Sequence, residues 1–132
     1  MTADILRANI ERSIEAHDRL LGACLPALTV AADALIGAYR AGHKAFFLGI
    51  GGSAADAQHL AAEFVGRYLR ERRPLPAVAL NVNTSAVTAI ANDYGYHHVF
   101  ARQLEALAMP GDVAVAISAS GRSEERRVGK EC

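Results

Sequence analysis

The chain has 132 residues, of which 52% are hydrophobic and 21% are charged, so its composition predicts a folded globular protein and excludes intrinsic disorder. Its 14 basic and 14 acidic residues balance, so charge predicts neither a nucleic-acid partner nor a membrane partner. Cys24 and Cys132 form neither a disulfide framework nor a zinc-ligand spacing. No apolar run approaches membrane-spanning length and the N-terminus does not resemble a signal peptide, so we expect a soluble, cytoplasmic protein.

The first third of the chain predicts two helices. Between residues 4 and 21, apolar side chains recur at three- and four-residue steps with polar residues between them, as on an amphipathic helix. Pro26 suits the first turn of a second helix, and Gly42 suits its C-cap. We therefore treat residues 1–43 as an N-terminal helical segment.

Beyond this segment the pattern alternates between strands and helices. The apolar run at 44–50 is continuous, which is typical of a parallel strand covered on both faces. Ser53 is expected to cap the next helix, which should run to about Arg70. The alternation predicts an α/β fold with a doubly wound parallel sheet. The remaining elements are expected at 77–82 (strand), 84–91 (helix capped by Thr84 or Ser85), 99–108 (helix) and 113–117 (strand).

Three polar segments are expected at one edge of this sheet. Gly51-Gly52-Ser53 follows the first strand, Ser118-Ala119-Ser120 follows the last, and Asn92-Asp93 lies at an element end between them. Ligands of such folds bind beyond the carboxyl ends of the strands. A glycine turn that opens a helix can also hold an anion on its backbone N–H groups. Because three polar segments are expected at one sheet edge, the sequence predicts a site for a phosphorylated ligand there.

The helix after the glycine turn carries a polar stripe. His59 and Glu63 lie four residues apart and therefore share a helix face, with Asp56 and Arg67 in the same stripe. The glutamate could act as a base that removes a proton next to a carbonyl. The pair could also ligate one divalent metal, although further ligands would have to come from elsewhere. A surface hydrogen bond or ion pair is the alternative that spacing alone favours.

The glycine turn has two interpretations. Residues 49–54 fit the dinucleotide pattern G-x-G-x-x-A, but that match alone has little specificity. A dinucleotide site also requires an acidic residue at the end of the second strand to bind the ribose, and Asn81-Val82-Asn83 offers none. Two long helices also precede the first strand, whereas the fingerprint usually opens its domain. A phosphosugar site explains more of the pattern, because small hydroxyl groups and helix N-terminal amides bind phosphate oxygens.

Several motifs together resemble the sedoheptulose 7-phosphate isomerase (phosphoheptose isomerase) family of the sugar isomerase (SIS) domain proteins. The motifs are Gly51-Gly52-Ser53-Ala54-Ala55-Asp56-Ala57-Gln58-His59, Ala62-Glu63-Phe64, Gly66-Arg67-Tyr68, Thr88-Ala89-Ile90-Ala91-Asn92-Asp93-Tyr94-Gly95-Tyr96 and Pro110-Gly111-Asp112. The resemblance implies a SIS-type, flavodoxin-like α/β/α sheet of three layers after two N-terminal helices. It also implies a homotetrameric, cytoplasmic enzyme with one zinc ion per subunit, which converts sedoheptulose 7-phosphate to glycero-manno-heptose 7-phosphate.

The resemblance also implies roles for single residues. Glu63 would shuttle a proton between C1 and C2 of the sugar through an enediol and would ligate the zinc together with His59. Arg67 would be a nearby charge partner. The implied substrate contacts are Gly51, Gly52, Ser53, Glu63, Arg67, Asn92 and Asp93, with Ser118, Ala119 and Ser120 in the phosphate-binding loop.

Two positions depart from the family pattern. Ile50 stands where the family usually has asparagine, and Ala119 replaces a common threonine of the phosphate loop. Because Ile50 removes a polar substrate contact, a second function stays open. The alternative is a non-catalytic SIS protein that binds a phosphosugar or associates with a replication initiator.

The last residues differ in kind from the rest. Residues 122–132 match the in-frame translation of a common sequencing-library adapter, so we expect a partial SIS domain at 44–121 and a non-native tail at 122–132. The glutamine and histidine that complete the family's zinc site would then be missing. We expect this truncated chain to be inactive as an isomerase.

Overall fold

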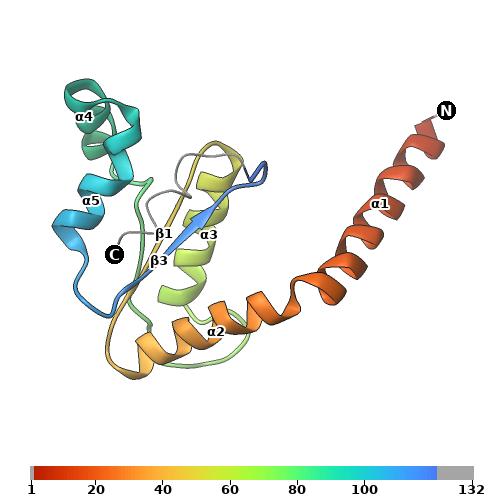
Figure 1. Ribbon diagram of the computed structural model, residues 1–132, viewed down its shortest axis with the longest axis horizontal. Coiled ribbons are helices and arrows are strands. Elements are labelled where there is room, and N and C mark those ends of the chain that lie inside the picture. Colours follow the sequence, from red (N-terminus) through yellow and green to blue (C-terminus); the bar gives the residue numbers. More distant parts are fainter. Residues whose placement is uncertain (1, 122–132) are drawn as a thin grey trace. The chain divides into compact units, whose positions relative to one another are not determined.

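The computed structural model describes residues 2–121 (Figure 1). The described part of the chain divides into two compact units, residues 2–36 and residues 37–121. The expected boundaries at 43 and 121 stay a prediction, and the expected non-native tail lies outside the described residues. The elements are α1 (Thr2–Ala23), α2 (Leu25–Arg40), β1 (Ala45–Gly49), α3 (Gly52–Val65), β2 (Ala77–Ala79), α4 (Thr84–Tyr94), the short 3₁₀ helix η1 (Tyr96–His98), α5 (Val99–Leu107) and β3 (Val113–Ile117).

The first unit consists of α1 and the greater part of α2. The predicted amphipathic helix is confirmed and extends two residues further at each end, and Pro26 lies in the first turn of α2 as expected. Within the described part of the chain, no single helix is long and apolar enough to cross a membrane; α1 and α2 reach that length and composition only together, across a 73° bend. No residue of α1 is buried, and its apolar side chains are 57–61% exposed at Ile5, Leu6, Ile10, Ile14 and Leu21.

The end of α2 turns the chain directly into the sheet. The N–H of His43 donates to the carbonyl of Ala38 at 2.9 Å, and the N–H of Gly42 donates to that of Tyr39 at 3.2 Å. These two bonds form a Schellman motif, which needs a left-handed residue, and Gly42 has φ +87°. The predicted C-cap is therefore confirmed.

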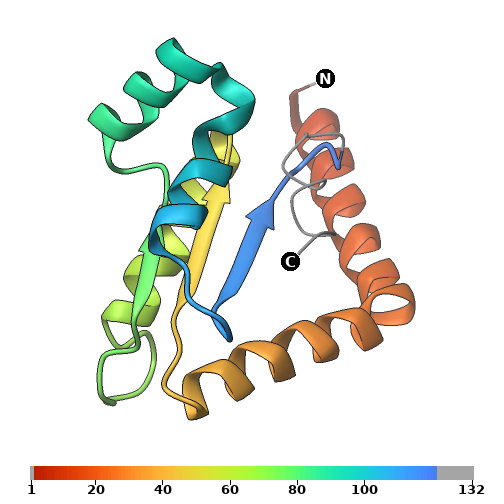
Figure 2. The ribbon, with the colours of Figure 1, turned by 60° about the vertical axis from the view of Figure 1, so that its left-hand side comes forward.

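The three strands are parallel and lie in the order β2-β1-β3 (Figure 2). β1 pairs with β3 along its whole length, from Ala45 to Gly49. Every residue of β1 is buried, as the continuous apolar run predicts. β2 is shorter than the expected strand at 77–82, because the chain turns away after the N–H of Leu80 donates to the carbonyl of Phe47 at 2.9 Å.

One face of the sheet is covered by α3. The ring centroids of Phe47 and Phe64 are 5.4 Å apart, and Phe64 also stacks on Tyr39 at 5.4 Å. Ala57 and Ala61 are buried on the same helix, so small side chains bring α3 close to the strands. The predicted apolar face of this helix therefore forms one layer of the fold.

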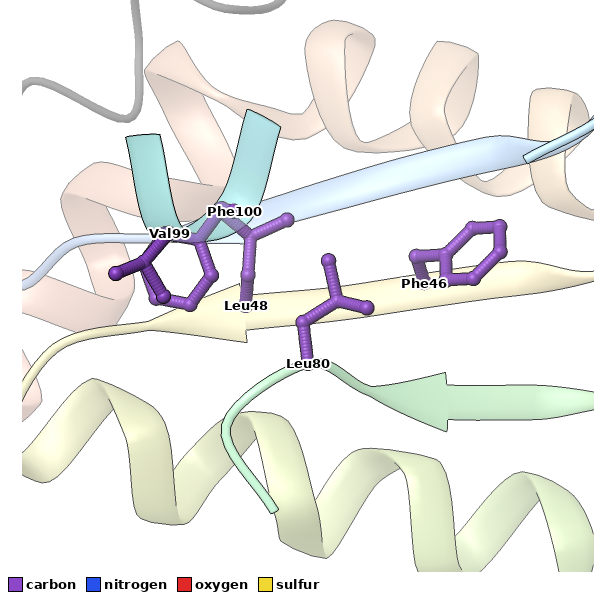
Figure 3. Close-up of a cluster of buried hydrophobic side chains, with 5 residues drawn as sticks. All are labelled: Phe46, Leu48, Leu80, Val99 and Phe100. Atoms are coloured by element: carbon purple, nitrogen blue, oxygen red, sulfur yellow. The ribbon is translucent and has the colours of Figure 1, made fainter. Parts of the chain in front are cut away.

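The opposite face is covered by α5 (Figure 3). Successive side chains of a strand point to opposite faces, so Phe46 and Leu48 face away from α3. They form a buried cluster with Leu80, Val99 and Phe100. Burial of each large apolar side chain contributes about 1.5–3 kcal/mol to folding. The expected three-layer α/β/α arrangement is present in this unit.

The end of α3 differs from the expectation. The helix ends at Val65 and not near Arg70. The guanidinium of Arg72 donates from Nη2 to the carbonyl of Glu63 at 2.7 Å and from Nη1 to that of Phe64 at 2.8 Å. The last carbonyls of a helix lack partners within the helix, and here a side chain from the following loop supplies them.

The start of α4 also differs from the expectation. The N-cap is Asn83, whose Oδ1 accepts from the N–H of Ala86 at 3.0 Å. The predicted caps Thr84 and Ser85 are wrong by one or two positions. Asparagine caps a helix as well as serine or threonine does, because its side-chain oxygen reaches the same N–H group.

Asp112 joins the start of β3 to the start of β1. Its side chain is 4% exposed, and its Oδ2 lies 2.7 Å from Nζ of Lys44. Its two oxygens also accept from the N–H groups of Lys44 at 3.0 Å and Met109 at 2.8 Å. Burial raises the pKa of this carboxyl, but the hydrogen bonds and the charge of Lys44 outweigh burial and lower the pKa to about 2. This ion pair fixes the amino-terminal edge of the sheet, opposite the expected site.

Candidate active site

The glycine turn between β1 and α3 forms the centre of the candidate site. Gly51 has φ +62° and is the N-cap of α3, and no side chain caps this helix end. Ser53 therefore lies inside the first helical turn, so its predicted role as the cap is wrong. The N–H groups of Gly52 and Ser53 lie at the start of the helix, and no side chain caps them. Uncapped N–H groups of this kind bind anions at helix N-termini.

Gly49 allows the end of β1 to lie against this turn. A Cβ at Gly49 would lie 2.5 Å from the carbonyl oxygen of Ser53, so no larger residue fits. Ser53 itself is 7% exposed. Among residues 2–121, no hydrogen bond satisfies the Ser53 hydroxyl. Buried polar groups are nearly always hydrogen-bonded in folded proteins, so this hydroxyl is available to a ligand or to water.

His59 and Glu63 lie side by side on α3, as their spacing predicts. Nε2 of His59 is 3.5 Å from Oε1 of Glu63, and the two side chains are 73% and 36% exposed. Two ligands of one tetrahedral zinc ion, each at about 2.0–2.2 Å, are separated by roughly 3.3–3.6 Å. The pair therefore fits two positions of a zinc site. Within the part of the chain that the structure describes, no group of three or more metal-binding side chains completes the site.

The predicted polar stripe loses its last member. Because α3 ends at Val65, Arg67 lies beyond the helix, where its Nη1 is 3.9 Å from Oε2 of Glu71. Asp56 is exposed on the first half of the helix. The structure therefore brings His59 and Glu63 together but places Arg67 on a surface ion pair.

Asn92 and Asp93 lie in the last turn of α4. Both are exposed, and Nδ2 of Asn92 donates to Oδ1 of Asp93 at 2.9 Å. The next residue, Tyr94, is covered by the guanidinium of Arg102 at 3.9 Å from the ring centroid. The side chains of Asn92 and Asp93 therefore bind each other. Among residues 2–121, no hydrogen bond joins either of them to the glycine turn.

The third predicted segment follows β3. Because β1 and β3 are parallel and adjacent, Ser118 begins a loop at the same sheet edge as the glycine turn. Ser118 is half-buried, whereas Ala119 and Ser120 are exposed. Ile50, at the centre of this edge, is apolar and 47% exposed. The edge therefore combines uncapped amides and hydroxyl groups with one apolar side chain.

Sequence reasoning missed Asn81 and Gln103. The side chain of Asn81 forms hydrogen bonds with both backbone groups of Gly49, and Nε2 of the buried Gln103 donates to the carbonyl of Leu80 at 3.0 Å. The sequence showed only that an acid is absent at the end of the second strand. A side-chain amide next to a strand end was the available signal, but its partner is 32 positions away.

Several known proteins are similar to this chain in sequence. The family model described as the SIS domain matches residues 10–126. The phosphoheptose isomerase of Rhodospirillum rubrum is 54% identical over 120 residues, which is 91% of this chain and 63% of the relative. The phosphoheptose isomerase of Aquifex aeolicus is 61% identical over 87 residues, which is 66% of this chain and 46% of the relative. The chain spans about six tenths of the length of the first of these relatives.

Solved structures are similar over the same extent. A phosphoheptose isomerase from Francisella tularensis superimposes with a TM-score of 0.89 at 34% identity, over 97% of this chain and 67% of that one. The phosphoheptose isomerase of Neisseria gonorrhoeae gives a TM-score of 0.81 at 41% identity, over 93% and 64% of the two chains. Fold and sequence therefore agree on one group of relatives.

Proposed function

The chain belongs to the SIS domain family, and from this premise we propose that its parent protein is an aldose–ketose isomerase acting on sedoheptulose 7-phosphate. The observation that carries the proposal is the buried Ser53 hydroxyl, which lacks a partner among the described residues, beside the uncapped N-terminus of α3. Oxygen atoms of a phosphorylated sugar would accept from this hydroxyl and from the N–H groups of Gly52 and Ser53. The relatives named phosphoheptose isomerase support the same substrate class.

Glu63 is the proposed acid/base residue. Its carboxyl group is 36% exposed on the site face of α3, so a bound sugar can reach it. As a carboxylate it would take the proton from C1 of the ketose and leave a 1,2-enediolate with its negative charge on O2. The same carboxyl would return the proton to C2 while a hydroxyl proton moves from O1 to O2, which forms the aldose. No other reactant is consumed.

His59 and Glu63 would hold the proposed zinc ion, because their nitrogen and oxygen atoms have the separation of two ligands of one tetrahedral ion. When bound, the ion would supply a positive charge that polarises the sugar carbonyl. By resemblance, a glutamine and a histidine from sequence that this chain does not contain would complete the site. Ser118, Ala119 and Ser120 would bind the phosphate, with Asn92 and Asp93 contacting the sugar.

The exposed stripe of α1 supports a homo-oligomer, which the resemblance expects to be a tetramer. The stripe consists of Leu6, Ile10, Ile14 and Leu21, which share one face of the helix and are 57–61% exposed. Contiguous exposed apolar side chains are typical of an interaction surface. A second copy of the same chain would bury an equivalent stripe.

Binding of sedoheptulose 7-phosphate to the 132-residue chain, measured by isothermal titration calorimetry, tests the proposal. We expect Ser53→Ala to weaken binding about tenfold, because one buried hydrogen bond is lost. Ser85→Ala is the matched control, since Ser85 is an exposed serine at the start of α4, and its affinity should stay within about twofold. Absence of binding by the unmodified chain would refute the proposal.

A turnover assay addresses the reaction itself. We expect the 132-residue chain to form no aldose, because the proposed zinc site is incomplete. The full-length parent should form it at a rate that a chelator or Glu63→Gln abolishes. Product formation by the short chain, abolished by Glu63→Gln, would contradict the expected inactivity.

Ile50 favours the second candidate function, a non-catalytic SIS protein that binds a phosphosugar or a protein partner. It places an exposed apolar side chain where the family usually offers a polar contact. The two functions differ in the turnover assay: a full-length parent that binds the sugar phosphate without converting it would be such a protein.

A further inference from the structure

The pairing of β2 with β1 continues through a side chain after the strand itself has ended. The last backbone bond of this ladder runs from the N–H of Leu80 to the carbonyl of Phe47 at 2.9 Å. One residue further, the N–H of Gly49 donates to Oδ1 of Asn81 at 3.3 Å, and Nδ2 of Asn81 donates to the carbonyl of Gly49 at 2.7 Å. The amide of Asn81 thus replaces a peptide group in the ladder.

The chemistry of this contact requires an amide. Gly49 presents one donor and one acceptor, so its partner must supply one acceptor and one donor. A carboxylate of the same shape supplies acceptors only and would face the carbonyl oxygen of Gly49 with a negative charge. Asn81 is half-buried and Gly49 is buried, so water replaces the lost donor poorly.

The position of Gly49 determines the position of the first turn of α3. A Cβ at Gly49 would lie only 2.5 Å from the carbonyl oxygen of Ser53. The end of the strand and the start of the helix are therefore in direct contact. A shift of Gly49 would therefore move Ser53 and the uncapped amides with it. Interiors of proteins transmit such shifts because they are closely packed.

The segment that carries Asn81 is itself anchored. Nε2 of Gln103, a buried residue of α5, donates to the carbonyls of Leu80 and Val99, each at 3.0 Å. The backbone before Asn81 is therefore attached to the helix that covers the other face of the sheet. Asn81 connects this anchored segment to the glycine turn.

We propose that Asn81 is a positioning residue of the phosphosugar site: its amide holds Gly49, and through Gly49 it aligns Ser53 and the first amides of α3 with the phosphorylated ligand. This role rests on the proposed function. It also explains why the end of the second strand carries an amide where a dinucleotide site carries an acid, since this side chain binds the chain's own backbone and not a ribose.

The test compares Asn81→Asp with Asn83→Asp. The first substitution keeps the shape of the side chain and removes the donor to Gly49. The second adds the same charge two residues away and keeps its hydrogen bond, because aspartate caps a helix as well as asparagine does. The measurement is the shift of the backbone amide resonances of Gly52, Ser53 and Ala54 in NMR spectra of the 132-residue chain, titrated with inorganic phosphate and with sedoheptulose 7-phosphate.

We expect Asn81→Asp to bind both probes about tenfold more weakly at pH 7, and Asn83→Asp to bind within about twofold of the unmodified chain. Lowering the pH of Asn81→Asp toward about 4 should restore the turn resonances, because the protonated carboxyl again supplies a donor and an acceptor. A role in stability alone would alter resonances throughout the sheet, including those of β3. If Asn81→Asp does not fold, Asn81→Ala, which adds no charge, should show the same loss.

Unchanged affinity in a folded Asn81→Asp chain, or an equal loss in Asn83→Asp, would overturn the inference and leave the proposed function intact. An unmodified chain that binds neither probe would overturn both. Loss of affinity in Asn81→Asp but not in Asn81→Ala would assign the effect to charge, which also overturns the positioning role.

Discussion

α1 and β1 are both apolar on the faces that their patterns predict, yet they differ completely in burial. No residue of α1 is buried, whereas every residue of β1 is. β1 has a strand on each edge and a helix on each face, and α1 has no comparable neighbour within its own unit. An apolar pattern thus predicts an element and its apolar face, but its burial depends on which other elements surround it.

The same comparison assigns different roles to the two regions. The side chains around β1 supply the stability of the sheet unit and fix the geometry of the glycine turn. The side chains of α1 contribute little to a single chain and are available to a partner. Substitutions in the two regions should therefore change different observables.

Phe46→Ala should have the largest effect. Phe46 is 1% exposed in the cluster between β1 and α5, and removing a buried phenylalanine side chain destabilises a protein by about 3–5 kcal/mol. Urea denaturation followed by circular dichroism measures the change. Val78 pairs with Phe46 in the parallel ladder but is 36% exposed, so Val78→Ala is a matched control and should cost less than about 1 kcal/mol. Equal losses would show that the cluster does not determine stability.

Asp112→Asn tests the other end of β1. The substitution keeps the shape of the side chain but removes the charge that Lys44 pairs with, and should lower the free energy of unfolding by about 1.5–3 kcal/mol at pH 7. The folded pKa lies below the ordinary value of 3.8, so the stabilisation is complete above about pH 4 and is lost as the pH falls toward 2.

The difference in stability between the unmodified chain and Asp112→Asn should therefore shrink over that pH range in urea denaturation. Glu105→Gln, at an exposed carboxyl of α5, is the control for the loss of one negative charge. A difference that stays constant down to pH 2 would mean that the pKa of Asp112 is not lowered.

The elements that the sequence predicts best are those whose signals are local. β3 was expected at 113–117 and is observed there, because a continuous apolar run bounded by a Pro-Gly turn is sufficient to place it. The C-cap at Gly42 was equally local, since only the left-handed conformation of a glycine was needed. The glycine turn and the pairing of His59 with Glu63 were also predicted from spacing, and both are present.

The features that the sequence did not predict depend on contacts between distant residues. Arg72 binds the carbonyl of Glu63 near the end of α3, and Asn81 binds Gly49 at the end of the β1–β2 ladder. Neither residue type indicates its partner in the sequence. In the same way, periodicity placed Glu63 and Arg67 on one stripe, but the early end of α3 separates them. Propensity describes a segment in isolation, whereas these ends are decided by side chains from other segments.

The smallest effect on the single chain is expected at α1. Serine at Ile10 and Ile14 removes two exposed side chains, which are 61% and 57% accessible, and should change the free energy of unfolding by less than about 0.5 kcal/mol. Serine and isoleucine have similar helix propensities, so α1 itself should persist.

The same double substitution should nevertheless lower the mass of the assembly in sedimentation velocity, because an interface between copies loses part of its apolar core. Serine at Arg12 and Glu15, which are exposed on the side of the helix opposite Ile10 and Ile14, removes one charge of each sign and should leave the mass unchanged. If both pairs of substitutions leave the mass unchanged, copies of the chain do not associate through this stripe, and the contrast between α1 and β1 would need another partner. A loss of mass for the apolar pair alone would show that α1 is buried after all, by a neighbour that a single chain does not contain.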